Sequence, residues 1–323
     1  MPSPVDTLAA NLLSPIVLAF ALGALATLVR SDLRIPDALY ETLSIYLLLA
    51  IGLKGGVALS TAEPGAIVVP AVVTVLLGAA VPVWCVAILR GLGRFPRVEA
   101  AAIAAHYGST SAVTFVACIT FLAASGVEVE AFMTTLVALM EVPGIVVALL
   151  LAQSRRGVAW GETIRELLTG KSIVLLVGGL VIGFVAGPAR FAPVEPLFVD
   201  LFYGLLVLFL LELGLVAARR FRDIGRAGPF LVGFAVVMPV IHAFIGATLG
   251  TAAGLSVGGA TVLGILTASA SYIAAPAAVR IALPEANPSL YLTPVLAITF
   301  PFNLAVGIPL TYAMAGALAG LGG

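Results

Sequence analysis

Charge is scarce in this sequence. Asp, Glu, Lys and Arg make up only 10% of the 323 residues, whereas hydrophobic residues make up 61%. A soluble domain carries about 25% charged residues, so the composition excludes an ordinary soluble protein. The apolar residues form long unbroken runs, whereas a membrane β-barrel shows alternating segments of about ten residues. The expected fold class is therefore an all-α polytopic membrane protein that lies in a lipid bilayer.

Other features are missing as well, and each absence excludes a class of function. The formal net charge is zero, which gives no reason to expect nucleic acid as a partner. The two histidines and the scattered acids lack metal-ligand spacing. No phosphate-binding loop, nucleophile elbow or HExxH motif is present, so neither an enzyme nor a cofactor is expected. Met1–Asn11 has no basic residue, so no cleavable signal is expected.

Ten apolar runs are long enough to cross a bilayer as helices, at roughly 20 residues per crossing. Clusters of charged residues, Gly and Pro separate them. The predicted spans are Ser14–Val29, Ala38–Leu59, Gly65–Leu89, Val98–Ala123, Ala131–Ala152, Lys171–Ala186, Pro196–Ala218, Gly228–Ala253, Val257–Leu283 and Ser289–Gly316.

The two halves of the chain resemble each other. Ile51-Gly52-Leu53 in the second span matches Leu213-Gly214-Leu215 in the seventh, and Pro143 of the fifth matches Pro301 of the tenth. Because five spans per half is an odd number, the second half must enter the membrane in the opposite direction. We therefore predict a 5+5 inverted repeat. Residues 1–152 form the first repeat, 153–170 a cytoplasmic connector and 171–323 the second repeat.

Basic residues gather in alternate loops of this arrangement. One side of the membrane has only Arg190 in its loops. The other side has Arg30, Arg34, Arg90, Arg94, Arg97, Arg155, Arg156, Arg165, Lys171, Arg219, Arg220, Arg222 and Arg226. Because Lys and Arg are retained in cytoplasmic loops, the rich side is predicted to be cytoplasmic and both termini to lie outside.

Two short polar segments interrupt the fourth and ninth spans at matching positions. The segment in the fourth span consists of Gly108, Ser109, Thr110 and Ser111. The segment in the ninth span consists of Ser269, Ala270, Ser271 and Tyr272. Hydroxyls in a helix often bond back to a carbonyl one turn earlier, but adjacent hydroxyls point in several directions. We predict that both helices break here and cross, so that two positive N-terminal ends hold a small anion.

A carboxylate in the fifth span suggests a cation site. Glu141 could bind a cation, carry a proton, or pair with Arg280 or a backbone N–H group. Asn303 and the carbonyl of Thr299 in the tenth span would add oxygen ligands that suit Na⁺. Lys54 in the second span either extends to the outer interface or attracts anions.

Several stretches resemble the sodium-dependent bicarbonate transporter family, over nearly the whole chain. They are Ser14-Pro15, Ile51-Gly52-Leu53-Lys54-Gly55-Gly56, Gly108-Ser109-Thr110, Met140-Glu141-Val142-Pro143, Ala268–Arg280, Pro284–Ser289 and Gly307-Ile308-Pro309-Leu310. The resemblance implies ten helices as an inverted repeat, bicarbonate between two crossed breaks, Na⁺ close by, a homotrimer and a PII-like cytoplasmic regulator.

This chain departs from the family pattern at three places. Glu141 stands where cyanobacterial members have Asp, and Tyr272 replaces a family Asp in the second break. The connector 153–170 is also shorter, which weakens the case for the same regulator. Asn303 is absent from the matching cyanobacterial position and would compensate for the lost carboxylate.

The sequence thus leads to three functional hypotheses. The first is Na⁺-coupled uptake of bicarbonate across a bacterial cytoplasmic (inner) membrane. The second keeps the fold but makes it a proton- or Na⁺-coupled carrier of another small anion, such as an organic acid. The third is a membrane sensor or scaffold whose basic loops recruit a partner.

Overall fold

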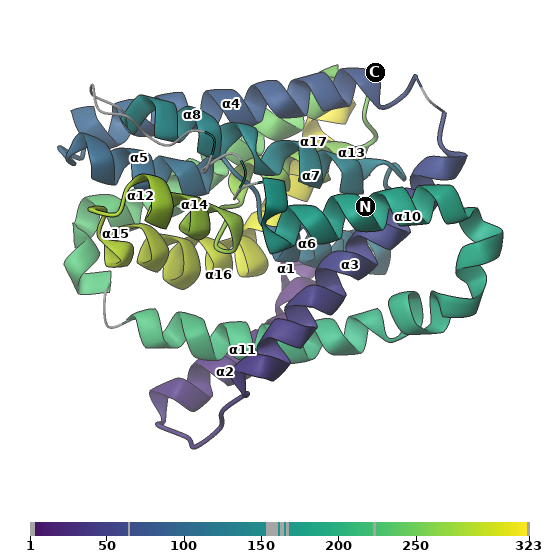
Figure 1. Ribbon diagram of the computed structural model, residues 1–323, viewed down its shortest axis with the longest axis horizontal. Coiled ribbons are helices and arrows are strands. Elements are labelled where there is room, and N and C mark those ends of the chain that lie inside the picture. The colour runs from purple at the N-terminus through teal and green to yellow at the C-terminus, as the bar shows by residue number, and fades with distance from the viewer. Residues whose placement is uncertain are drawn as a thin grey trace.

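The computed structural model describes residues 4–63, 65–152, 161, 165, 168–221 and 224–321, which are helical and contain no strand (Figure 1). In the first half the helices are α1 (Pro4–Leu12), α2 (Pro15–Leu28), α3 (Asp37–Thr61), α4 (Val68–Gly91), α5 (Arg97–Tyr107), α6 (Ala112–Ala124), α7 (Met133–Glu141) and α8 (Pro143–Ala152). Most of the predicted connector 153–170 lies outside the described residues.

The second half continues with α10 (Lys171–Phe191), η1 (Ala192–Val194), η2 (Pro196–Asp200), α11 (Phe202–Arg220), α12 (Ile224–Ala252), α13 (Val257–Ala268) and α14 (Ala274–Ala282). It ends with α15 (Pro288–Thr293), η4 (Pro294–Thr299), α16 (Phe300–Phe302), η5 (Asn303–Gly307) and α17 (Ile308–Leu321). The segments η2, η4 and η5 are π-helical.

Eight of the described helical segments are long and apolar enough to cross a membrane. They are Asp37–Thr61, Val68–Gly91, Arg97–Ala124, Met133–Ala152, Lys171–Val194, Pro196–Arg220, Gly228–Ala252 and Pro288–Gly320. Two shorter apolar helices, Pro15–Leu28 and Val257–Ala268, lie where the first and ninth spans were predicted. The all-helical membrane class is confirmed, whereas the count of ten spans stays a prediction.

The helices fall into two groups in space (Figure 1). In the first group, which we call the panel, α2 packs along α11 and α3 packs along α10. In the second group, the core, α5 packs on α4 and α8, while α13 packs on α12 and α17. Each of the two panel pairs therefore joins one helix from each half of the chain.

Glycines allow the panel helices to touch through their backbones. A Cβ atom added to Gly52 would lie 2.9 Å from the Cα atom of Gly179. A Cβ atom on Gly23 would overlap the carbonyl of Leu211, and one on Gly214 would overlap the carbonyl of Phe20. Small residues at such contacts are a common way to bring membrane helices together.

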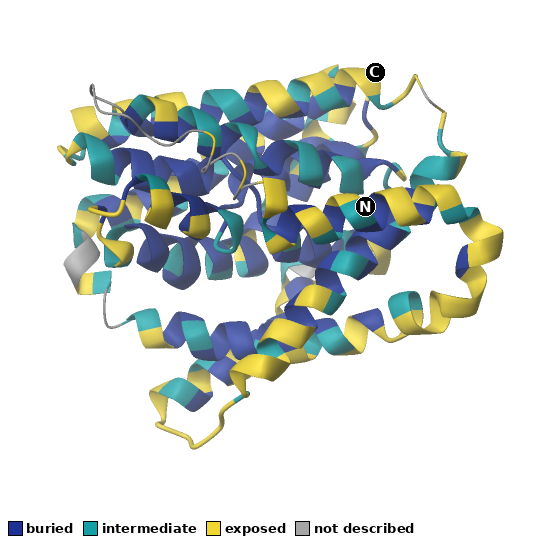
Figure 2. Cartoon of the chain, in the orientation of Figure 1, coloured by how far each residue is buried: buried dark blue, intermediate teal, exposed yellow. Residues whose placement is uncertain are grey.

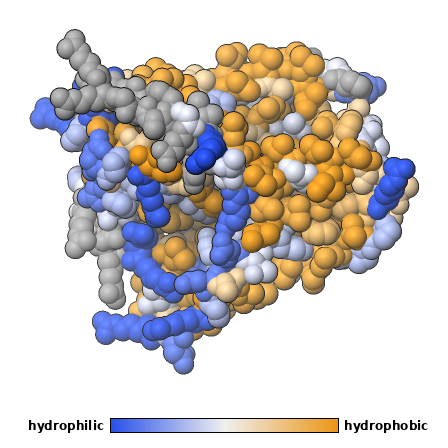
Figure 3. Space-filling model, in the orientation of Figure 1, coloured by the Kyte–Doolittle hydropathy of each residue, from blue (hydrophilic) through white to orange (hydrophobic). Residues whose placement is uncertain are grey.

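Apolar side chains cover much of the outer surface (Figure 3), and Figure 2 shows exposed residues along the outer sides of the helices. Exposed Leu and Val residues follow α2, α4 and α10, as the large exposed fractions of Leu22, Leu76 and Val185 illustrate. On the face shown in Figure 3, hydrophilic residues gather on the left and again at the right-hand edge, and a broad apolar surface lies between them. Such a surface is suited to contact with lipid.

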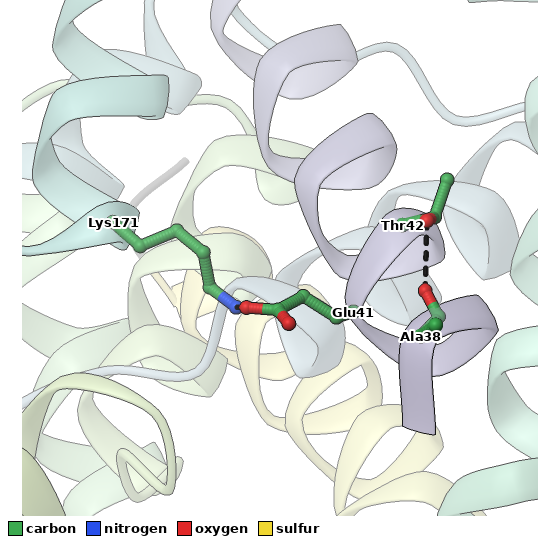
Figure 4. Close-up of polar contacts among 4 residues, drawn as sticks. All are labelled: Ala38, Glu41, Thr42 and Lys171. Atoms are coloured by element: carbon green, nitrogen blue, oxygen red, sulfur yellow. Dashed lines mark hydrogen bonds and ion pairs between the residues drawn. The ribbon is translucent and has the colours of Figure 1, made fainter. Parts of the chain in front are cut away.

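One ion pair links the two long panel helices. Lys171 at the start of α10 lies 3.3 Å from a carboxylate oxygen of Glu41 on α3 (Figure 4). On the same turn of α3 the Thr42 hydroxyl donates to the Ala38 carbonyl at 2.7 Å. Both side chains of the ion pair are solvent-exposed, so it stabilises the fold only weakly.

Candidate functional site

The two predicted breaks are present, and they meet. Helix α5 ends at Tyr107 and α6 begins at Ala112, while α13 ends at Ala268 and α14 begins at Ala274. The backbone N–H of Ser271 donates to the carbonyl of His106 at 2.8 Å across the junction. Two interruptions about 160 residues apart in sequence therefore contact each other directly, inside the core group.

The Ser269 hydroxyl is the centre of this contact. Its oxygen lies 3.0 Å from the Thr110 hydroxyl and accepts the backbone N–H of Ser111 at 3.0 Å. It also donates to the Leu266 carbonyl at 2.9 Å, so Thr110 is the donor in the hydroxyl pair. Ser269 thus accepts two hydrogen bonds and donates one, and its hydroxyl capacity is used in joining the breaks.

Ser111 and Ser271 instead cap the helices that follow the breaks. The Ser111 oxygen accepts the backbone N–H of Thr114 at 3.2 Å, and the Ser271 oxygen accepts that of Ala275 at 3.2 Å. A hydroxyl that accepts in this way keeps its own proton for another acceptor. The first N–H groups of α6 and α14 also lack intrahelical partners, so both helix starts favour negative charge.

A small cavity lies at these helix starts. Its lining residues are Leu48, Thr110, Ser111, Ala112, Glu141, Ser172, Ser271, Tyr272 and Ile273. The cavity volume is about 10 Å³, which is room for about one water molecule. In this conformation the cavity must widen before an anion with several heavy atoms can enter.

Four of the eight predicted anion-binding residues line the cavity, and four do not. Thr110, Ser111, Ser271 and Tyr272 line it. Of these, Tyr272 has a buried hydroxyl without a hydrogen-bond partner among the described residues. Its hydroxyl lies near that of Ser111, so Ser111, Ser271 and Tyr272 bring the side-chain hydroxyl groups of this cavity together.

The other predicted anion ligands form the frame of the junction. Gly108 lies against Gly144, where an added Cβ atom would overlap the Gly108 carbonyl. Ser109 donates its hydroxyl proton to the Glu141 carbonyl at 2.8 Å. Ala270 is buried beside Ser269. These residues hold the backbone of the two breaks in place, and the hydroxyl protons of Ser109 and Ser269 are donated to backbone carbonyls.

Glu141 brings a carboxyl group to the cavity. The side chain is 5% exposed, and its Oε2 atom has no hydrogen-bond partner among the described residues. The Ser172 hydroxyl of α10 lies near the carboxyl group and lines the same cavity. Arg280, the structural partner considered from the sequence, is exposed, and no ion pair joins it to Glu141 in the described chain.

The three predicted cation ligands do not converge on one cavity. Asn303 donates its amide to the Ala268 carbonyl at 2.9 Å, and its Oδ1 atom is buried without a partner among the described atoms. Thr299 donates to the Ala235 carbonyl and accepts the Tyr107 hydroxyl, both at 2.7 Å. Asn303 and Thr299 do not line the cavity that contains Glu141.

Two features of this region were missed from the sequence. Ser172 is a single hydroxyl near the start of an apolar run, so nothing in the local pattern marks it. The π-helical segments that contain Thr299 and Asn303 widen the helix and shift carbonyl positions, and such bulges are frequent at functional sites. Prolines 294 and 301 were visible in the sequence, but periodicity does not distinguish a π-helix from an α-helix.

No group of three or more His, Cys, Asp and Glu side chains in the described chain could hold a metal ion, and no cofactor is indicated. The sequence profile of the Na⁺-dependent bicarbonate transporter superfamily matches residues 15–316. Among curated proteins, none matches the chain. The family match covers most of the chain and includes both breaks, α7 and the panel.

Proposed function

The chain belongs to the Na⁺-dependent bicarbonate transporter superfamily, and on this basis we propose that it couples the uptake of bicarbonate to the entry of Na⁺. The anion binds between the starts of α6 and α14. The observation that carries the proposal is the convergence of two helix N-termini, side-chain hydroxyl groups and a buried carboxylate on one cavity.

The donors at the cavity match the chemistry of a small oxyanion. The hydroxyls of Ser111, Ser271 and Tyr272 line it, and the first two accept backbone N–H groups while keeping their own protons. The backbone N–H groups at the two helix starts add further donors and positive partial charge. Donors of this kind bind an anion without a buried Lys or Arg. Gly108, Ser109, Ser269 and Ala270 contribute by fixing the geometry.

Glu141 makes a coupling cation necessary in this arrangement. A carboxylate and a bicarbonate anion in one cavity repel each other unless a positive charge lies with them. Na⁺ at Glu141 supplies that charge, so the anion binds well only when the cation is bound. Asn303 Oδ1, which is buried without a partner among the described residues, and the carbonyl of Thr299 lie outside this cavity, and we propose them as Na⁺ ligands in a conformation that brings them to Glu141.

The membrane potential also favours coupling. Moving one anion inward against an inside-negative potential of 100 mV costs about 2.3 kcal/mol. Symport with one Na⁺ cancels this cost, and a tenfold Na⁺ gradient adds about 1.4 kcal/mol. An uncoupled carrier with the same site would release bicarbonate from the cell.

The helix arrangement supports the remaining parts of the proposal. The panel pairs α2 with α11 and α3 with α10, which is the exchange expected when two related halves intertwine as a 5+5 inverted repeat. We place ten spans in a bacterial cytoplasmic membrane with both termini outside, because the basic residues then fall inside. A trimer and a PII-like regulator follow from the family resemblance alone.

A second candidate is a proton-coupled carrier of another small anion, such as an organic acid. The observation that favours it is the unpartnered Oε2 atom of Glu141, which can carry a proton as readily as it can bind Na⁺. Tyr272 in place of a family carboxylate points the same way, since one expected Na⁺ ligand is absent.

Uptake of labelled bicarbonate into proteoliposomes separates these candidates. Uptake that rises with an inward Na⁺ gradient is the expected result. Uptake that responds only to a pH gradient, or that a carboxylate suppresses by competition, would identify the second candidate. Absence of flux for every tested anion would contradict both and would leave a sensor or scaffold role.

A further inference from the structure

Four cavities form a series along the boundary between the panel and the core. The cavity at Lys171, against α10 and α14, shares Ser172 and Ile273 with the small cavity at the breaks. That cavity shares Leu48 and Ala112 with a second narrow one. The series runs past the proposed anion site and continues beyond it.

The second narrow cavity leads to a wide one around Lys54. The two share Ile51 of α3 and Val116 of α6. The cavities at Lys171 and Lys54 have volumes of about 280 and 390 Å³, whereas each of the two between them has about 10 Å³. A transport path in an occluded conformation is expected to have this form, with a wide cavity at each end and a closed segment between them.

The wide cavity at Lys54 is built to receive a negative charge. The Lys54 ammonium group lies 4.7 Å from the centroid of the Phe202 ring, and no ion pair to it occurs within the described chain. Glu130 also lines this cavity, but its oxygens accept the backbone N–H and hydroxyl of Ser256 at 2.5 and 3.1 Å. These hydrogen bonds hold the Glu130 carboxylate at the start of α13, and no ion pair joins it to Lys54 within the described chain.

The hydroxyls around Lys54 add neutral donors. Thr120, Thr134 and Tyr203 line the cavity together with apolar side chains. At the opposite end of the series, Lys171 is already paired with Glu41 at 3.3 Å (Figure 4). The two ends therefore differ in how their lysines are partnered: Lys171 is paired with Glu41, whereas the Lys54 ammonium group lies over the Phe202 ring and no ion pair joins it to Glu130 within the described chain.

We propose that the cavity around Lys54 is an anion-capture site at the outer entrance of the transport path, in which Lys54 attracts a singly charged oxyanion before it reaches the two breaks. The inference deepens the proposed function and rests on it. The Phe202 ring holds the ammonium group by a cation–π contact, which an arriving anion replaces with a charge-assisted hydrogen bond. Lys54 thereby raises the local substrate concentration without taking part in the closed site.

The test is the concentration dependence of bicarbonate uptake at low and high ionic strength. Lys54→Gln is expected to raise the KM of uptake about tenfold at low salt and to leave the maximal rate within about twofold, because steering by a charge is lost while translocation is not. The difference from the unaltered protein should shrink at high salt. Lys54→Arg should keep a KM near the original value.

Two comparisons make the result specific to this position. Arg190→Gln removes an exposed positive charge from the predicted outer side of the membrane and should leave KM unchanged. In Lys54→Cys, an aminoethyl methanethiosulfonate reagent restores a positive charge and should lower KM again. The native cysteines, Cys85 and Cys118, are fully buried, so position 54 is the one modified from outside.

The possible failures are distinguishable. Absence of anion uptake by the unaltered protein overturns the proposed function and this inference with it. Intact uptake with the same KM and salt dependence in Lys54→Gln overturns the capture site alone. If Lys54→Gln does not fold, the Lys54→Cys protein decides the question, since KM is compared before and after modification of one folded sample.

Discussion

In the proposed function, coupling depends most directly on Glu141. A carboxylate that is 5% exposed inside an apolar protein is costly to ionise without a compensating charge. Ser172 lies near it, but a single hydroxyl does not neutralise a full charge. The site therefore requires either Na⁺ or a proton at this position, and the choice between them is the choice between the two candidate functions.

Replacement of Glu141 by Gln tests this requirement. The amide keeps the size of the side chain but removes the charge that attracts Na⁺, so uptake should fall by about tenfold or more and lose its Na⁺ dependence. The measurement is uptake against external Na⁺ concentration in proteoliposomes. Glu63→Gln, at an exposed position after α3, is the matched control and should behave like the unaltered protein. An unchanged Na⁺ response in Glu141→Gln would assign Glu141 a structural role.

Individual residues show where sequence reasoning succeeds and where it ends. Gly108 to Ser111 and Ser269 to Tyr272 break their helices as expected, because glycine and adjacent hydroxyls offer the backbone alternatives to helical bonding. Their separate roles were not predictable. Whether a hydroxyl faces the cavity, as in Ser111, or joins two segments, as in Ser269, depends on contacts made across the fold.

At the scale of elements, the broken helices depend on a backbone contact between α5 and α8. Gly144, in the first turn of α8, lies so close to Gly108 that a Cβ atom would overlap its carbonyl. Gly108 in turn has the ring of Pro82 from α4 beside it. The close packing of α4, α5 and α8 therefore fixes the position of the first break. This packing is possible because neither glycine has a side chain.

Gly144→Ala should disturb this arrangement. An added methyl group has to push the two backbones apart, which costs about 1–3 kcal/mol in a packed interior. We expect a lower melting temperature of the detergent-purified protein and reduced uptake, measured on the same preparation. Gly178→Ala is the control, since a Cβ atom there meets nothing within 4 Å and alanine favours a helix. Equal stability of both variants would contradict the close contact.

Element boundaries were predicted with mixed success. The spans from the second to the fifth agree with α3, α4, α5–α6 and α7–α8, because turns rich in charge, Gly and Pro mark them clearly. The short helix α1 and the π-helical segments η2, η4 and η5 have no clear signal in the sequence pattern. Helix α1 depends on tertiary packing, because it contacts α17. Its residue Asn11 also donates hydrogen bonds to the carbonyls of Leu304 and Ala305, at 2.9 and 3.0 Å.

At the scale of the whole molecule, the panel and the core form two bodies with cavities along their boundary. Helices of the panel touch one another through their backbones, as α3 and α10 do at Gly52 and Gly179. Transport in related architectures proceeds by rocking or sliding of one bundle against another. We expect the core to move relative to the panel and to carry both breaks with it.

A cross-link between the two bodies should therefore stop transport. Ile173 of the panel and Ala277 of α14, a helix that packs on α5 and α8 of the core, line the same cavity. A bifunctional thiol reagent should therefore join the pair Ile173→Cys and Ala277→Cys and block uptake reversibly. The pair Lys171→Cys and Glu41→Cys lies within the panel and should tolerate the same reagent. Full activity in the cross-linked Ile173→Cys and Ala277→Cys protein would mean that the two bodies do not move apart.

The size of the cavity at the breaks has a consequence for speed and for leakage. With room for about one water molecule, this conformation offers an anion no continuous aqueous route, so ion gradients across the membrane are expected to persist while it lasts. Each passage has to wait for a collective motion of helices, which takes microseconds to milliseconds or longer. The molecule is thus expected to work one cargo at a time, and never with the throughput of an open pore.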